Sequence, residues 1–129
     1  EFISLLTERL SVKGRLITYS TAASIRASLI RAGLRIYSIA PSIDDQHKWS
    51  SGTVATKKKI EQHNISENCQ FKDLSTREIE HLATRSSIPY RDPTGKGSCK
   101  EIISTREIEQ SKSQLINTSS WRKRWNTAQ

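Results

Sequence analysis

The sequence predicts an α/β fold, and three observations support this. Residues 14–40, GRLITYSTAASIRASLIRAGLRIYSIA, read as strand, helix and strand, a unit that favours two parallel strands joined by a right-handed crossover. GTVAT at 52–56 is a further short strand that could pair back on residues 34–39. The rest of the chain is polar, and it predicts a helical and irregular extension rather than more sheet.

The first strand and the start of the helix follow from residue types. Residues 15–19 are rich in β-forming side chains and predict a largely buried strand. Ser20 or Thr21 can then cap a helix, because a hydroxyl oxygen there accepts a hydrogen bond from a free N–H group of the first turn.

The helix between the two strands has an apolar face that includes Ile25, Leu29 and Ala32. Arg26 lies off this face; it could reach a phosphate, and we favour an orientation toward solvent. Gly33 is expected to end the helix, because glycine adopts the left-handed conformation of a helix end at least cost.

Residues 1–10 already carry a helical pattern, with Phe2, Leu6 and Leu10 on one face, and the chain contains no methionine. Two parallel strands are also too few for an open sheet, which typically has about four to six. We therefore expect the N-terminal part of the domain to lie outside this sequence. A trimmed form of an intact domain is the alternative.

The hexapeptide STREIE occurs twice, at 75–80 and 104–109. Each copy has the capping-box pattern, with Ser75 three residues before Glu78 and Ser104 three before Glu107, so each predicts a helix start. Two copies are too few for a repeat array, which needs about three or more.

Several other motifs are weaker. TGKGS at 94–98 lacks the spacing and the preceding strand of a phosphate-binding loop. Lys57, Lys58 and Lys59 read as a solvated strand end rather than a phosphate contact. The three histidines and two cysteines show no paired ligand spacing, so we predict no metal site.

The net charge of +8 suits an anionic partner such as RNA, although many proteins use excess charge only to stay soluble. Residues 112–129 contain four Lys and Arg and no acidic residue. Two cysteines are too few for a disulfide framework, and no apolar run is long enough to cross a membrane, so we expect a cytoplasmic protein.

Residues 14–36 resemble the late strand–helix–strand of the MnmC-like tRNA methyltransferases, in which a strand ending in Thr-Tyr-Ser precedes an Arg-containing helix and an Ala-Gly-Leu/Phe turn. The matching residues are Thr18, Tyr19, Ser20, Ala22, Ala23, Arg26, Leu29, Ala32 and Gly33. EIEHLATRSSIPYRDPT at 78–94 and SSWRKRW at 119–125 resemble the C-terminal extension of one branch. Where bifunctional members carry a Gly/Lys/Arg-rich hairpin after the second strand, this chain has WSSGTVAT.

The resemblance implies the C-terminal portion of a Rossmann-like class I methyltransferase sheet, followed by a helical and loop-rich extension. Residues 1–59 would belong to the methyltransferase domain and 60–129 to the extension, with 60–73 a linker. The family uses S-adenosyl-L-methionine to methylate the exocyclic amine of 5-aminomethyl-2-thiouridine at the tRNA wobble position. The cofactor loop and the Asp-containing substrate motif would precede Glu1, so this chain is expected to hold no cofactor-binding residue.

Two groups of residues are candidates for substrate contact. Tyr19 and Ser20 lie at the carboxyl end of a strand of the α/β unit, and ligands of open α/β sheets gather beyond such ends. A buried tyrosine and a helix cap is the alternative that we favour for this pair. Trp121, Arg122, Lys123, Arg124 and Trp125 place three cations between two indoles, a composition that suits RNA. Packing of the two tryptophans as a terminal anchor is slightly favoured over RNA contact.

Two functions of different classes remain open. The first is a C-terminal fragment of a tRNA methyltransferase, whose full-length form is an enzyme. The second is a small basic RNA-binding or interaction module without catalytic activity. A glycine-rich strand–loop–helix encoded upstream would distinguish the first from the second.

Overall fold

The computed structural model describes residues 2–61 and 71–126. The chain forms two compact units, one of residues 1–21 with 28–75 and one of residues 22–27 with 76–129. The boundary runs through helix α2, Ala23–Arg31. The first unit contains the sheet, and the second contains the helices of the C-terminal half.

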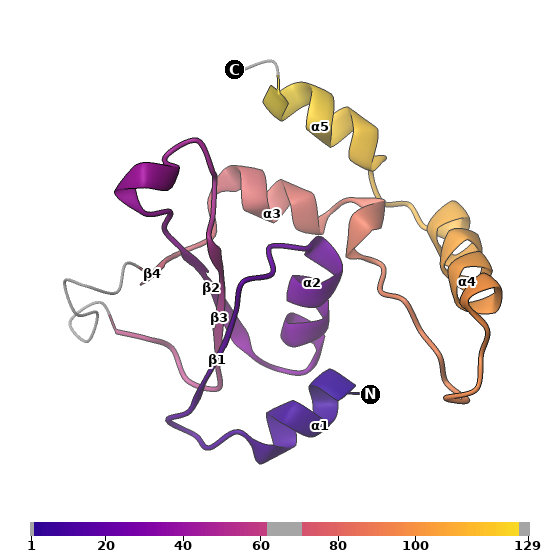
Figure 1. Ribbon diagram of the computed structural model, residues 1–129, viewed down its shortest axis with the longest axis horizontal. Helices are drawn as coiled ribbons and strands as arrows, with labels where there is room; N and C mark the ends of the chain where they lie inside the picture. The colour runs from indigo at the N-terminus through magenta and orange to yellow at the C-terminus, as the bar shows by residue number, and fades with distance from the viewer. Residues whose placement is uncertain (1, 62–70, 127–129) are drawn as a thin grey trace. The chain divides into compact units, whose positions relative to one another are not determined.

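The sheet has four strands in the order β1-β3-β2-β4 (Figure 1). Their bounds are Arg15–Thr18 for β1, Arg35–Ile39 for β2, Gly52–Thr56 for β3 and Phe71–Lys72 for β4. All three pairings are antiparallel. The expected pairing of GTVAT on the second strand is confirmed, with Tyr37 opposite Val54.

β1 and β2 run in the same direction, as expected for the strand–helix–strand unit. They are not neighbours, because β3 lies between them and pairs antiparallel with both. All five residues of β3 are buried, and its small and β-branched side chains suit a central strand. Part of the expected linker 60–73 is also strand, because Phe71 and Lys72 form β4; residues 62–70 lie outside the described part.

The core of the first unit sits on one face of this sheet. Tyr37, Val54 and Phe71 form a buried cluster, and Ile39 and Ile60 pack against it. The Tyr37 hydroxyl accepts a hydrogen bond from the Ile60 amide at 2.9 Å, so the one polar atom of this aromatic side chain is satisfied. The cluster therefore joins β2, β3, β4 and the segment that follows β3.

The helices of the first unit follow the sequence closely. Helix α1, Phe2–Arg9, forms as expected, although none of its residues is buried. Helix α2 ends two residues before Gly33, whose left-handed φ of 88° terminates it as expected. The Gly33 amide donates to the Ile30 carbonyl and the Leu34 amide to the Leu29 carbonyl, the paired hydrogen bonds of a Schellman motif.

The second unit contains α3, Thr76–Leu82, α4, Cys99–Lys112, and α5, Thr118–Asn126. The second STREIE copy does not start a helix: Ser104 lies inside α4, and the capping box is formed by Ser98 and Glu101. In the turn that precedes this cap, Gly95 adopts a left-handed φ of 68°. No helix within the described ranges is long and apolar enough to span a membrane.

Arg26 does not face solvent, which corrects the sequence-based expectation. Its Nη1 atom lies 2.5 Å from Oε2 of Glu78, and the two side chains are 1% and 0% exposed. Glu78 belongs to the first STREIE copy, where a capping role was expected. Helical periodicity placed Arg26 off the apolar stripe. It cannot reveal that this guanidinium is buried, because the carboxylate that pairs with it lies 52 residues away in sequence.

Replacing Glu78 by Ala is expected to lower the free energy of unfolding by about 3–5 kcal/mol, because it leaves the Arg26 guanidinium buried without its carboxylate. Urea denaturation followed by far-UV circular dichroism measures this change.

The chain supplies a matched control at the same place in the second STREIE copy. Glu107 is exposed on α4, so Glu107→Ala is expected to change the free energy of unfolding by about 0.5 kcal/mol or less. The double variant Arg26→Met/Glu78→Leu should recover most of the free energy of unfolding that Glu78→Ala loses, because neither charge of the pair remains buried. Equal unfolding midpoints for Glu78→Ala and Glu107→Ala would show that the buried pair is unimportant.

Candidate functional site

The first candidate site is the edge of the sheet where β1 and β2 end and β3 begins. β1 ends at Thr18, one residue earlier than expected, so Tyr19 and Ser20 directly follow it. Tyr19 is 94% exposed, so the alternative of a buried tyrosine is wrong. Because β1 and β2 run in the same direction, the residue after Ile39 lies at this edge too.

The backbone at this edge is held by one side chain of β3 and one of β1. The hydroxyl of Thr53, a residue that is 0% exposed, donates to the Ser20 carbonyl at 2.8 Å. On the other side of Tyr19, the Thr18 hydroxyl accepts a hydrogen bond from the Ser20 amide at 3.1 Å. The chain on both sides of the Tyr19 ring is therefore fixed.

Gly52 permits a close approach of β3 to β1 at the same point. A Cβ atom at this position would lie 2.4 Å from the Thr18 carbonyl oxygen and 3.1 Å from Cα of Tyr19. Its φ of 155° is also unfavourable for other residues. Any side chain here would push the end of β1 away.

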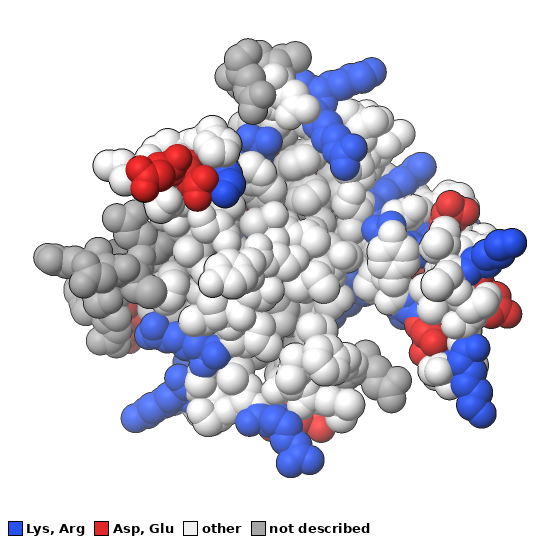
Figure 2. All heavy atoms as spheres, viewed as in Figure 1, with Lys and Arg blue, Asp and Glu red and all other residues white. Residues whose placement is uncertain are grey.

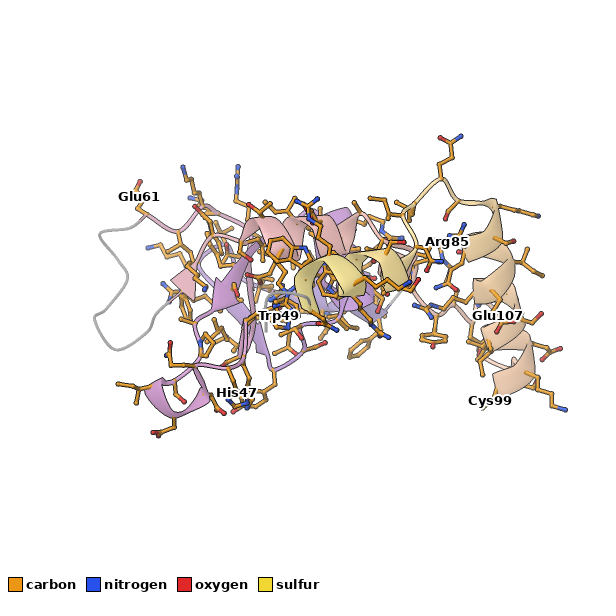
Figure 3. All side chains as sticks on the ribbon, turned by 90° about the horizontal axis from the view of Figure 1, so that it is seen from above. His47, Trp49, Glu61, Arg85, Cys99 and Glu107 are labelled. Atoms are coloured by element: carbon orange, nitrogen blue, oxygen red, sulfur yellow. The ribbon has the colours of Figure 1, made fainter. Side chains whose placement is uncertain are left out.

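Ser50 connects this edge to β2. Its hydroxyl lies 2.7 Å from the Ser38 hydroxyl and donates to the Gly52 carbonyl at 2.9 Å, and both serines are buried. His47 and Trp49 precede it in the segment that leads from η1, Ile43–Asp45, to β3 (Figure 3). The sequence analysis did not identify Ser50 and Gly52 as site residues. The signal that could have identified them is the sequence SSG at 50–52, which leads into the strand GTVAT.

The second candidate site is α5, which carries the five WRKRW residues. Trp121 is 9% exposed, and its Nε1 atom donates to the Arg77 carbonyl at 3.0 Å. Its ring stacks on His81 with centroids 4.2 Å apart. Trp121 thus anchors α5 on α3.

The second tryptophan of the motif is held by Glu80. Nε1 of Trp125 donates to the Glu80 carboxylate at 2.8 Å, and the Arg124 guanidinium forms an ion pair with the same group at 3.0 Å. The Arg77 guanidinium lies over both indoles, 5.6 Å from the Trp121 centroid and 5.9 Å from that of Trp125. Such cation–π contacts add to the packing.

Arg122 and Lys123 complete the motif, and both are exposed. Helix α5 has no acidic residue, and Figure 2 shows Lys and Arg side chains gathered over it without Asp or Glu among them. Over α4, by contrast, both signs alternate in the same view. The exposed cations of α5 therefore form a positive patch.

The loop between η3, Arg85–Ser87, and α4 is held by Arg106. This guanidinium donates to the Ile88 carbonyl at 2.7 Å and lies 4.2 Å from the centroid of the Tyr90 ring. Figure 3 shows Cys99 and Glu107 along α4. Among the residues that the structure describes, no group of three His, Cys, Asp or Glu side chains could hold a metal ion.

Burial lowers the pKa of His81, and the nearby cations Arg26, Arg122 and Arg77 lower it further. The neutral imidazole stacked on Trp121 is therefore favoured by folding. Because the unfolded chain binds the proton more tightly, the contribution of His81 to stability is present above its ordinary pKa of about 6.5 and is lost as pH falls through the lower folded value.

The melting temperature is expected to fall between pH 7.5 and 5.5, and His81→Phe should remove the part of this change that arises from the imidazole. An NMR titration of the His81 Cε1 proton, compared with the same proton in the urea-unfolded chain, measures the pKa difference directly. A folded pKa equal to or above the unfolded value would contradict the geometry described.

Comparison with known proteins places the chain in a family. The model of a family described as S-adenosyl-L-methionine-dependent methyltransferase matches residues 1–71, more than half of the chain. No curated protein matches. The crystal structure of MNMC2 from Aquifex aeolicus matches with a TM-score of 0.64 and 25% sequence identity.

This structural match covers 87% of the chain and 32% of the MNMC2 chain. The present sequence therefore spans about a third of the length of that solved relative. The family match includes α1, the strands β1 to β3 and the first residue of β4. The chain belongs to the S-adenosyl-L-methionine-dependent methyltransferases of the MnmC2 type and represents part of their domain.

Proposed function

We propose that the chain is the C-terminal part of a tRNA methyltransferase with a Rossmann-like class I sheet. Its substrate would be the exocyclic amine of 5-aminomethyl-2-thiouridine at the wobble position. The observation that carries this proposal is the structural match to MNMC2, which extends over 87% of the chain and thus beyond the family model's residues 1–71. A cytoplasmic location accompanies this function.

The β1–α2 connection does not fit the cofactor of the family. In open α/β folds a glycine-rich turn between a strand and a helix lets the backbone approach such a ligand. The β1–α2 connection instead holds Tyr19, Ser20, Thr21 and Ala22, with no glycine. S-adenosyl-L-methionine would therefore be held by residues outside this chain, and the chain would contribute elements on the substrate side.

The basic patch of α5 supports tRNA as the partner. Arg122 and Lys123 are exposed on a helix without acidic residues, and α5 is anchored to α3 through Trp121. A rigid helix that presents cations suits phosphate contacts, which supply sequence-independent affinity for nucleic acids. Trp121 would act by holding the helix, and the cations would meet the RNA.

A small basic RNA-binding module without catalysis is the second candidate. The net charge of +8 and the α5 patch favour it, since neither feature needs a methyltransferase site. Both candidates share RNA binding, so a catalytic assay of the full-length protein with under-modified tRNA separates them. Methylation of the wobble nucleoside supports the first candidate, and tRNA binding without methylation supports the second.

Replacing Arg122 and Lys123 together by Ser is expected to weaken tRNA binding in the full-length protein. The slope of log K against log salt should fall by roughly 0.7–0.9 for each lost phosphate contact. Fluorescence anisotropy with labelled tRNA at several salt concentrations measures both quantities. Arg124 is left unchanged because its ion pair with Glu80 helps to hold α5.

The control removes the same charge from α4. Lys100 and Lys112 are exposed at the two ends of that helix, among Glu101, Glu107 and Glu109. Lys100→Ser/Lys112→Ser should leave the salt slope nearly unchanged. If both double variants lower the slope equally, general charge rather than α5 attracts tRNA.

The 129-residue chain is expected not to bind S-adenosyl-L-methionine with micromolar affinity, because its strand-to-helix turn lacks glycine. Isothermal titration calorimetry with the cofactor alone tests this. A dissociation constant in the micromolar range would show that a cofactor site exists within these residues.

A further inference from the structure

Tyr19 combines a fixed backbone with a free ring. Its side chain is 94% exposed, compared with 86% for Ile43 in the same unit. Single exposed apolar residues are common and need no explanation by themselves. What distinguishes Tyr19 is its setting, since β3 holds the chain on both of its sides.

Three contacts create this setting. Thr53 fixes the Ser20 carbonyl, Thr18 fixes the Ser20 amide, and Gly52 lies against the Thr18 carbonyl with no room for a side chain. The register of β1 and β3 pairs Thr18 with Thr53, so Gly52 is the next residue opposite Tyr19. Because the backbone is already fixed, a ligand that binds the ring has only the side-chain torsions of Tyr19 to order.

The ring also lies where a substrate is expected, beyond the carboxyl end of β1. A phenol ring with both faces open offers a flat, mainly apolar surface and one hydroxyl. Unstacked bases of single-stranded RNA are recognised by stacking on aromatic rings of this type. An enzyme that modifies a base must also take it out of its stack.

We infer that Tyr19 is a stacking platform for an unpaired nucleobase of the RNA substrate, a role that rests on the proposed function. Ser20, Gly52 and Thr53 are positioning residues that hold the platform. The ligand class is a splayed base of a single-stranded loop, and double-stranded RNA does not offer one.

The test measures binding of a labelled tRNA anticodon stem-loop to the wild-type protein, Tyr19→Ala and Tyr19→Phe. Tyr19→Ala should weaken binding by about 5- to 150-fold, the range that corresponds to loss of one stacked base. Tyr19→Phe keeps the ring and should stay within about threefold of the wild type. Ile43→Ala removes a similarly exposed side chain from the same unit and should have no effect.

The salt dependence identifies the type of contact. Tyr19→Ala should leave the slope of log K against log salt unchanged, because stacking releases no counterions, whereas a phosphate contact would lower it. A blunt-ended RNA duplex should bind the wild type and Tyr19→Ala equally. Circular dichroism spectra that coincide confirm that the exposed substitution leaves the fold intact.

The outcomes separate this inference from the proposed function. If the wild type binds the stem-loop and Tyr19→Ala binds equally well, the platform is wrong and the proposed function stands. If the wild type does not bind the stem-loop, the proposed function is wrong, and the role of Tyr19 that rests on it is wrong too. If Tyr19→Phe loses as much affinity as Tyr19→Ala, the hydroxyl rather than the ring makes the contact, which also overturns the platform.

Discussion

The placement of β3 between β1 and β2 is the constraint on which the first unit depends. This strand is antiparallel to both neighbours, and all five of its residues are buried. It contributes Val54 to the core and Thr53 to the support of Ser20. Gly52, its first residue, permits the close approach to Thr18. One strand thus connects the packing of the sheet with the geometry of the edge where we place the substrate.

The second unit depends on polar groups more than on apolar ones. Helix α3 contributes Glu78, which pairs with the buried Arg26 of α2, and Glu80, whose carboxylate holds Arg124 and Trp125. Only Glu78 is buried in α3, and α4 has no buried residue. Paired charges bring little net stability but are costly to break, so such a unit gains a defined arrangement rather than a large free energy.

Local patterns predicted local structure well. The helix end at Gly33, the pairing of 52–56 on β2 and the family itself followed from adjacent residues. Long-range relations were missed: the sequence did not predict that β3 lies between β1 and β2, or that Arg26 pairs with a residue far along the chain. The two STREIE copies show why, since one sequence gives a buried Glu78 and an exposed Glu107. Burial depends on packing partners, and a hexapeptide does not specify them.

Hydrogen exchange by mass spectrometry, with and without under-modified tRNA, tests the central claim most directly. The account predicts slower amide exchange in three segments: 18–22 and 49–53 at the sheet edge, and 118–126 in α5. Helix α4, which carries as many acidic as basic residues, should be unaffected. Protection of α4 alone, or unchanged exchange at the sheet edge with protection confined to α5, would contradict a substrate site at the end of β1.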